Sequence, residues 1–481
     1  MSGFKEFDEY DAVGMAELVA NKDVTATELL DEAIDRTERI NPTINAVSLK
    51  HYDEARAAIK AGLPDGPLKG VPFLIKDLHL LLKGTVTTYG SGLFKDYMAD
   101  HNATLTQRYI DAGLVIFGKT NTPEFGLTCT TEPRLFGQTK NPWDLSKTSG
   151  GSSGGASAAV AAGIIPAANA SDGGGSIRIP AAMTGLFGMK PTRGRTPMGP
   201  DRGEGWAGQS ISHALSRTVR DNAALLDATQ GTAPGDPYEV QAPARPYVLD
   251  AAQDPKPFRI AVNTKTAGGN EPEADVLKSI EETVKLLESL GHTVEEAHVD
   301  IDPAAFGRAQ LTMICANIAA TIDNRLADLG RDLQQGDIEN TTDAMAQMGR
   351  AATAADYTRA VTYMHNLGRS YAALHETYDV YLSPVTGSAP IPLAWLDTMT
   401  DNGDEYAERI GKFVPYTGQF NMTGQPSMSV PLFWNDEGLP IGSMFTGAFG
   451  DEATLFQLAG QLERAQPWAN KRAPTWAGSN A

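Results

Sequence analysis

The sequence predicts an α/β protein whose core is a mixed β-sheet with helices on both faces. Short apolar strands alternate with amphipathic helices along most of the chain, which is typical of a sheet covered by helices. The stretch 303–376 is almost purely helical and interrupts this alternation. Two glycine-serine clusters, "GGSSGGASAAVAAG" and "SDGGGSIRIPAA", lie close together between the elements and need a separate explanation.

The first elements follow from capping signals and apolar runs. Residues 25–40 are expected to form an amphipathic helix that begins with a capping box of Thr25 and Glu28 and ends at Asn41-Pro42. The run "GVPFLIKDLHLLL" predicts a buried strand that carries one lysine. Residues 103–112 are expected to be helical, "GLVIFGKT" to be a short buried strand, and "ASAAVAAG" to be a helix opened by the first glycine cluster.

The later elements restore the alternation on either side of the helical stretch. "FRIAVN" predicts a strand, "PEADVLKSIEETVKLLESLG" a helix that ends at Gly291, and "HTVEEAHV" and "YDVYLSPV" two further strands. The sequence contains no internal repeat and no clear interdomain linker. We therefore expect a single domain over residues 1–481, with residues 303–376 as a helical insertion that lies over the sheet and covers the substrate pocket.

Composition restricts the kinds of partner. The 59 acidic and 40 basic residues give a formal net charge of −19, which disfavours nucleic acid and anionic membrane surfaces. Two cysteines are too few for a disulfide framework and fit a reducing cytoplasm. The acidic start does not resemble a signal peptide, and the most apolar window is broken by Gly163 and Pro166 and is too short to cross a bilayer. We expect a cytoplasmic protein, and the charge leaves small neutral molecules possible as ligands.

Residues 113–120 match the phosphate-loop pattern G-x-x-x-x-G-K-[ST], but their context does not fit that motif. The middle residues are typical of a strand interior, and Thr122-Pro123 disfavours the helix that the motif requires. The eight histidines show no H-x-x-x-H pattern, and the cysteines are not paired in spacing. We therefore expect no nucleotide, no metal and no other cofactor.

The first glycine cluster also matches the nucleophile elbow G-x-S-x-G around Ser152. An elbow needs a strand directly before its serine, whereas "NPWDLSKTSG" is rich in turn residues and indicates a loop. Several later histidines are available to complete a Ser-His pair, namely His213, His292, His298, His365 and His375. A Ser-His esterase that uses Ser152 is therefore an alternative function.

A lysine within the buried run and the serine of the second cluster form another candidate centre. Burial lowers the pKa of a lysine, so Lys76 is a candidate base unless its amine reaches the sheet edge or pairs with Asp77. Strand alternation places Lys76, Leu78 and Leu80 on one face and His79 on the other, which favours lysine over histidine as the base.

Three glycines at 173–175 come directly before Ser176. Consecutive glycines allow backbone N–H groups to converge where negative charge develops, so Ser176 is a candidate nucleophile inside its own oxyanion hole. A tight turn between a helix and a strand is the alternative interpretation of these glycines.

Taken in order, several segments resemble the amidase signature family, the Ser–cis-Ser–Lys amide hydrolases. They are "KTNTPEFG", "FGQTKNPWD", "GGSSGGASAAVAAG", "SDGGGSIRIPAAMTGLFGMKPTRGR" and "NMTGQPSMSVPL", and the resemblance runs from about residue 10 to residue 470. It implies the amidase signature fold and hydrolysis of carboxylic amides through an acyl-enzyme. Where the family often has D-x-G-G-S, this chain has glycine as the second residue, which is expected to loosen the loop slightly.

By position, the resemblance makes Ser176 the nucleophile, Ser152 the bridging serine after a cis peptide bond, and Lys76 the base. It also assigns an oxyanion hole to consecutive backbone groups, those of Gly173, Gly174, Gly175 and Ser176.

The same resemblance assigns supporting positions around this centre. Asp172 and Arg178 fall on positions that brace the loop, and Gly126 and Thr128 fall on the segment that lines the acyl side of the substrate. The segments "TTEP", "KNPW", "GSIRIPA" and "KPTRGR" are similar to those of cyclic nylon-oligomer hydrolases, and aryl acylamidases share most of them. Cys315 corresponds to a pocket cysteine of the former group, although a cysteine on an apolar helix is also a common core residue.

The resemblance therefore implies hydrolysis of small non-peptide amides: linear or cyclic aliphatic amides or anilides, with carbamates and esters as further candidates. An alternative is the glutaminase subunit of a tRNA-dependent amidotransferase, which needs a partner subunit to hold the tRNA. The sequence does not determine the oligomeric state, and a homodimer is compatible with it.

Overall fold

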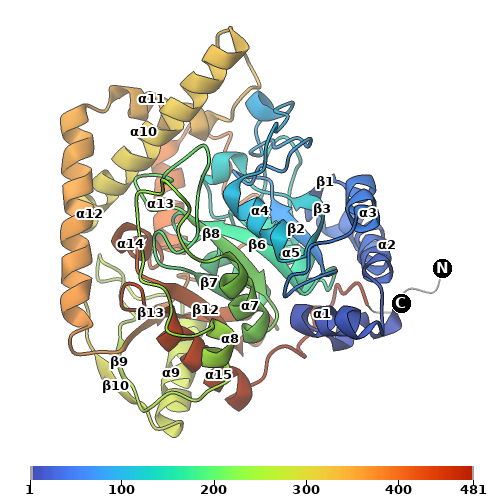
Figure 1. Cartoon of the computed structure of the whole chain (residues 1–481). Helices are drawn as coiled ribbons and strands as arrows, with labels where there is room; N and C mark the ends of the chain where they lie inside the picture. Colours follow the sequence, from blue (N-terminus) through green and yellow to red (C-terminus); the bar gives the residue numbers. More distant parts are fainter. Residues whose placement is uncertain (1–3, 479–481) are drawn as a thin grey trace.

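The structure is a computed structural model that describes residues 4–478, and it confirms the α/β class (Figure 1). The strands of its main sheet are β6 (Ala167–Asp172), β7 (Phe187–Lys190), β8 (Ile211–Ser216), β9 (Arg259–Val262), β10 (Thr293–Glu296), β11 (Val380–Pro384), β12 (Ser427–Trp434) and β13 (Pro440–Gly447). Their order is β10-β9-β11-β13-β12-β7-β8-β6. The first three are parallel and all other neighbours pair antiparallel, so the sheet is mixed as predicted.

A smaller sheet carries the buried lysine. Its strand order is β1 (Val47–Lys50), β3 (Val115–Thr120), β2 (Pro72–Lys76). A separate two-stranded sheet is formed by β4 (Lys140–Asn141) and β5 (Asp144–Thr148). The Lys76 backbone N–H donates to the Asn169 side-chain oxygen at 3.1 Å. Because Asn169 belongs to β6, this bond places the end of β2 beside the strand that leads into the second glycine cluster.

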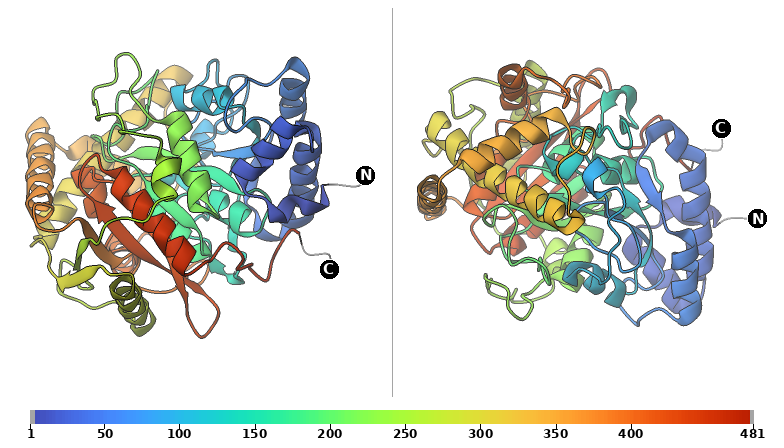
Figure 2. Two further views of the ribbon diagram at one scale, coloured as in Figure 1. Left: turned by 60° about the horizontal axis from the view of Figure 1, so that its bottom comes forward. Right: turned by 90° about the horizontal axis from the view of Figure 1, so that it is seen from above.

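Helices cover the main sheet on both faces (Figure 2). Successive residues of β11 face opposite layers: Val380 and Leu382 pack with Phe456, whereas Tyr381 packs with Phe420. The helices are α1 (Ala12–Asn21), α2 (Ala26–Ile44), α3 (Tyr52–Ala61), α4 (Thr104–Asp111), α5 (Gly154–Ala161), α6 (Arg178–Thr184), α7 (Val219–Thr229), α8 (Tyr247–Ala251), α9 (Ala274–Ser289), α10 (Pro303–Leu329), α11 (Asn340–Ala351), α12 (Ala354–Leu374), α13 (Gly403–Phe413), α14 (Gly418–Thr423) and α15 (Glu452–Ala465). Short 3-10 turns occur at Lys5–Glu9, Gly92–Phe94 and Glu124–Gly126.

The predicted helix after residue 25 is confirmed, but its end is not where the sequence places it. The capping box of Thr25 and Glu28 is present, and the helix passes through Pro42 to Ile44. A proline in the last turn removes only one hydrogen-bond donor, and the helix ends where Asn45 adopts the left-handed conformation with φ of 52°.

The buried strand is much shorter than "GVPFLIKDLHLLL" suggests, because β2 ends at Lys76. Its register with β3 ends at the pair Lys76–Thr120, and the chain then turns, with His79 at a φ of 62°. The prediction that Lys76, Leu78 and Leu80 share one strand face is therefore wrong, since no strand continues through residues 77–82. The other predicted strands and helices occur within a few residues of their expected bounds.

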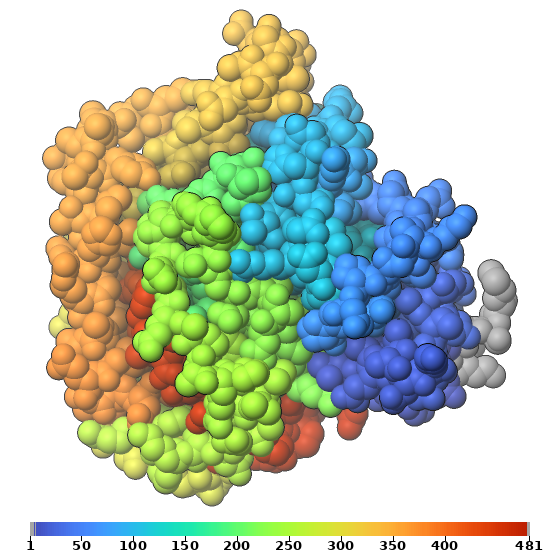
Figure 3. Space-filling model, in the orientation of Figure 1, coloured from blue at the N-terminus to red at the C-terminus, as the bar shows by residue number. Residues whose placement is uncertain are grey.

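The stretch 303–376 forms α10, α11 and α12, which stand at the opposite end of the molecule from α1–α3 (Figure 1). In the space-filling view these helices, yellow to orange, border the green segment around residue 200 (Figure 3). Within residues 4–478, no helix combines the length and apolar character needed to cross a membrane.

Candidate active site

Lys76 is fully buried at the end of β2 and is surrounded by hydroxyl groups. Its Nζ lies 2.7 Å from Ser152 Oγ, 3.0 Å from Ser153 Oγ and 3.1 Å from Ser171 Oγ. Asp77 does not pair with it, because its carboxylate accepts from the backbone N–H and the hydroxyl of Thr88. The structure therefore excludes both alternatives for Lys76, an amine that reaches solvent and an ion pair with Asp77.

The electrostatics of the site favour a neutral amine. Burial lowers the pKa of Lys76 to about 7, although the negative charge of Asp172 partly opposes this shift. At neutral pH a large fraction of the amine is unprotonated and can accept a proton. A neutral amine has only one lone pair, so one neighbouring hydroxyl donates to it while others accept from it.

The surrounding bonds leave the Ser152 and Ser171 hydroxyls as possible donors, because each is bonded only to Lys76 among residues 4–478. The Ser153 hydroxyl donates to the Ser171 carbonyl at 3.2 Å, so its proton is already engaged. Ser152 is the closest of the three hydroxyls, and its only hydrogen bond among residues 4–478 is to Lys76. Ser152 is therefore well placed to pass its proton to the lysine.

Ser152 lies in a loop held tightly against its neighbours. The Gly151-Ser152 peptide bond is cis, as the resemblance implies, and α5 begins two residues later. A Cβ on Gly151 would lie 2.5 Å from the Thr130 carbonyl oxygen, so only glycine allows this approach. The prediction of a loop over "NPWDLSKTSG" is wrong in part, because pairing with β4 makes Asp144–Thr148 the strand β5. Three residues still separate this strand from Ser152, and Ser152 is bonded to Lys76 rather than to a histidine, so the site does not match a nucleophile elbow.

Ser176 lies in the turn between β6 and α6, two residues before the helix begins, with 9% of its surface exposed. The Asp172 carboxylate holds this turn, since Gly175 N–H donates to it at 2.8 Å and Ile177 N–H at 3.2 Å. Arg178 donates to both carboxylate oxygens, at 2.9 and 3.0 Å. Burial alone raises the pKa of Asp172, but the Arg178 guanidinium holds it well below its usual value.

The backbone N–H groups around Ser176 differ in what they are free to bind. Gly175 N–H is engaged by Asp172, whereas the N–H groups of Gly173, Gly174 and Ser176 make no hydrogen bond within the part of the chain that the structure describes. A ligand oxygen can be held by these three, but not by Gly175 without breaking its present bond. No hydrogen bond joins the Ser176 and Ser152 hydroxyls among the same residues.

Four contributors to this site carry no role in the sequence analysis. Ser153 and Ser171 flank Lys76, and both stand inside the two serine-containing clusters. Asn421 donates to the Asp172 carboxylate at 2.8 Å and accepts from Arg178 at 2.7 Å. Thr417 donates to the Gly174 carbonyl at 2.6 Å. Asn421 begins the segment "NMTGQPS", which offered a signal, whereas nothing in the sequence marks Thr417.

The structure places one of the predicted substrate-lining residues, Gly126, against this centre. A Cβ on Gly126, where φ is 71°, would lie 3.1 Å from Ser152 Oγ, so this segment touches the bridging serine. Thr128 is buried, and its hydroxyl makes no hydrogen bond among residues 4–478. Cys315 is buried in α10 at the contact with α11. The two helices are so close there that a Cβ on Gly349 of α11 would lie 2.0 Å from the Cys315 carbonyl oxygen. Burial raises the pKa of the Cys315 thiol to about 11.

The remaining motif matches do not produce other sites. The lysine of the phosphate-loop pattern, Lys119, is buried in β3 and donates to the Val86 carbonyl and the Thr87 hydroxyl. A short 3-10 turn at Glu124–Gly126 follows, rather than the helix that the motif requires. Among residues 4–478, no three His, Cys, Asp or Glu side chains are grouped as a metal site.

The fold and this arrangement of Lys76 with two serine-bearing loops are consistent with the amide-hydrolase class that the sequence resembles. The chain belongs to the amidase family, whose model matches residues 28–456. It is 36% identical over 480 residues to the 6-aminohexanoate-cyclic-dimer hydrolase of Pseudomonas sp. (strain NK87), and the aligned region covers 96% of each chain. The enzyme of that name from Paenarthrobacter ureafaciens is 37% identical, with 96% of each chain covered.

A solved structure of 6-aminohexanoate cyclic dimer hydrolase complexed with substrate superposes with a TM-score of 0.91 at 34% identity, covering 97% of this chain and 99% of that one. The protein is therefore a hydrolase of carbon–nitrogen bonds other than peptide bonds, and its activity is amide hydrolysis. The predicted family and fold are confirmed.

Proposed function

We propose that this enzyme cleaves small non-peptide amides with Ser176 as the nucleophile, Ser152 as the proton relay and Lys76 as the base. The observation that carries this proposal is the 2.7 Å bond between Lys76 Nζ and Ser152 Oγ inside a fully buried pocket of hydroxyls. It supports a neutral lysine that removes a proton through a second serine.

In the proposed mechanism, Ser176 Oγ attacks the amide carbonyl while its proton passes to Ser152 and that of Ser152 passes to Lys76. The carbonyl oxygen becomes an oxyanion, which the N–H groups of Gly173, Gly174 and Ser176 stabilise. Protonated Lys76 returns the proton through Ser152 to the nitrogen, the C–N bond breaks, and an amine leaves. Water then attacks the acyl-enzyme by the same route and releases the carboxylic acid.

The bracing of this loop explains why the N–H groups stay in place. Asp172 binds Gly175 and Ile177, while Arg178 and Asn421 hold Asp172. Donors fixed in this way need no reorganisation when charge develops on the oxygen. Gly126 and Thr128 are proposed to line the acyl side, and the free Thr128 hydroxyl is available to a polar atom of the substrate.

For the substrate class, we propose linear and cyclic aliphatic amides, with anilides as a second group. Support comes from relatives named as hydrolases of the 6-aminohexanoate cyclic dimer and from an aryl acylamidase structure with a TM-score of 0.87 at 29% identity. We further propose that 303–376 covers the substrate pocket, that Cys315 contributes to it, and that the enzyme is cytoplasmic and homodimeric. The cytoplasmic assignment is supported by the two free, buried cysteines.

The test is a hydrolysis screen paired with serine labelling. Cyclic and linear aliphatic amides, anilides, carbamates, esters and glutamine are offered to the purified enzyme, and an alkyl fluorophosphonate is used to find the reactive serine. We expect turnover of aliphatic amides and a label on Ser176. A label on Ser152, or turnover of glutamine alone with a co-purifying partner, would replace this proposal by the esterase or the amidotransferase alternative.

A further inference from the structure

Trp206, which lies on the loop between β7 and β8, packs directly against the nucleophile turn. A Cβ on Gly173 would lie 2.6 Å from Cζ3 and 2.7 Å from Cε3 of the Trp206 ring. Only a glycine at 173 leaves room for the indole at this distance. The ring is partly buried and therefore covers the first glycine of the turn that carries Ser176.

The backbone that presents this indole adopts a conformation that side chains disfavour. Trp206 has φ of 52°, Ala207 of 56° and Gly208 of 78°, so three consecutive residues are left-handed. The turn is closed by Ser210 N–H, which donates to the Gly205 carbonyl at 3.0 Å. Non-glycine residues in this region are uncommon and concentrate at functional sites, so the conformation calls for a role for the side chain that it orients.

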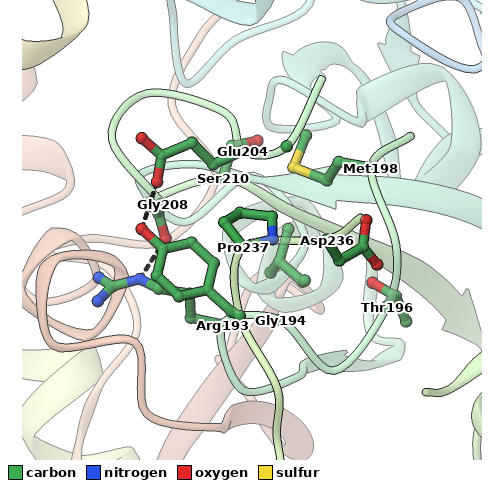
Figure 4. A pocket seen from close by; sticks show the side chains of 12 residues that line it. Arg193, Gly194, Thr196, Met198, Glu204, Gly208, Ser210, Asp236 and Pro237 are labelled. Carbon is green, nitrogen blue, oxygen red and sulfur yellow. Dashed lines mark hydrogen bonds between the residues drawn. The ribbon is translucent and has the colours of Figure 1, made fainter. Parts of the chain in front are cut away.

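Contacts with the site hold the base of the loop. Arg193 Nε donates to the Gly208 carbonyl at 2.6 Å, and Figure 4 shows both residues on the wall of a small cavity that Glu204 also lines. The Asn421 side chain, which also binds Asp172, donates to the Gln209 carbonyl at 3.0 Å. One amide side chain therefore holds the Trp206 loop and the nucleophile turn in a fixed relation.

The free space beside the nucleophile turn lies at Gly174. A Cβ on Gly174 would meet no atom within 4 Å, whereas Gly173 is covered by Trp206 and Gly175 is approached by Thr417. Trp206 also packs with an apolar cluster that includes Leu78, Ile318 and Ile322. Leu78 is also 2.8 Å from the Cβ position of Gly126, the residue beside Ser152.

We propose that Trp206 is a specificity-determining residue, whose indole forms the wall that limits the size of the substrate group beside Gly174. This inference rests on the proposed function, because it takes Ser176 as the reacting serine. An aromatic wall fixed by these contacts accepts flat or slender groups and excludes branched ones. Shortening the side chain is then expected to admit bulkier groups without altering the Lys76–Ser152 pair.

The experiment compares the rates at which Ser176 is labelled by a small methyl fluorophosphonate and by a bulky branched one. We expect Trp206→Ala to raise the ratio of bulky to small labelling rates by about tenfold or more, the scale of a change in a fitted pocket. Trp206→Phe, which keeps an aromatic ring, is expected to change it less. The matched control is Trp434→Phe, because Trp434 on β12 packs with Trp143 and lies outside the site.

The outcomes separate the two claims. If the wild-type enzyme is labelled at Ser176 but both Trp206 variants keep its ratio, the inference is wrong while the proposed function stands. If both labelling rates fall equally, Trp206 only supports the fold, and the inference is again wrong. If the wild-type enzyme is neither labelled at Ser176 nor active on amides, the proposed function fails and the inference fails with it.

Discussion

The Nζ atom of Lys76 lies 2.7 Å from Ser152 Oγ, and no carboxylate forms an ion pair with this lysine among residues 4–478. A buried lysine without an acidic partner loses the solvation of its charged form, so its pKa falls. The same bond gives the neutral amine a route for a proton. Burial therefore makes the amine neutral, and the bond to Ser152 lets that neutral amine accept a proton.

Replacement of the two serines is expected to have unequal effects. Ser176→Ala removes the nucleophile and should lower kcat/KM for an aliphatic amide by more than about 10,000-fold. Ser152→Ala should cost about 100- to 10,000-fold, because it removes only the proton relay, which water partly replaces. Both variants should unfold at the wild-type temperature in a thermal melt. Near-normal turnover by Ser176→Ala would show that another group attacks the substrate.

The pH profile is expected to report the titration of Lys76. Because the amine must be neutral to accept a proton, log kcat/KM should rise with unit slope below the pKa of Lys76, about 7, and level off above it. Lys76→Ala should abolish both the activity and the inflection, and Lys76→Arg should not restore them, because arginine stays protonated. The measurement needs an amide whose chemical step is slow. An inflection that persists in an active Lys76→Ala enzyme would assign the base to another group.

Asp172 is expected to set the position of that inflection. Its negative charge raises the pKa of Lys76, so Asp172→Asn should move the inflection to lower pH. The variant also leaves the buried Arg178 without the carboxylate that pairs with its charge, and we expect a loss of about 3–5 kcal/mol of stability together with a lower kcat. The profile is therefore recorded well below the melting temperature.

Asp77→Asn is the matched control for this shift. Asp77 is a buried acid next to Lys76 in sequence, but its carboxylate is bonded to Thr88. Its removal should leave the inflection unchanged. If the two variants move the inflection equally, or if Asp172→Asn raises it, the electrostatic role of Asp172 is wrong.

The sequence predicts the main chemical groups because they lie in local patterns. The glycine-serine clusters and the lysine in an apolar run each have a recognisable composition, and the structure brings Lys76 to Ser152. Helix caps are predicted for the same reason, since Thr25 and Glu28 are three residues apart. Features that depend on a few neighbouring residues can therefore be predicted from the sequence.

Features that depend on distant contacts are not accessible in this way. The end of β2 is fixed by its pairing with β3 and not by its own apolar run, so the face of His79 was predicted wrongly. The engagement of Gly175 N–H by Asp172 requires the geometry of the turn. Thr417 and Trp206 reach the nucleophile turn from other parts of the chain, and no local pattern indicates their contacts.

The last prediction concerns the helical insertion, whose two first helices meet at a glycine. Gly349 of α11 is packed against α10 so closely that a Cβ would lie 2.0 Å from the Cys315 carbonyl. Gly349→Ala must therefore push the helices apart, and we expect a loss of about 1–3 kcal/mol, measured by denaturant unfolding. The matched control is Gly307→Ala in α10, where a Cβ meets nothing within 4 Å.

Gly307→Ala should leave stability unchanged or raise it by up to about 1 kcal/mol, because alanine favours a helix. The proposed role of the insertion adds a second expectation for Gly349→Ala. If α10 and α11 cover the substrate pocket, their displacement should change kcat/KM unequally across cyclic amides, linear amides and anilides. The labelling rate of Ser176 by a small fluorophosphonate should stay close to that of the wild type, because the turn that carries it is braced by Asp172 and Arg178. A uniform loss across all substrates would indicate general packing damage, and the insertion would then have no part in substrate choice.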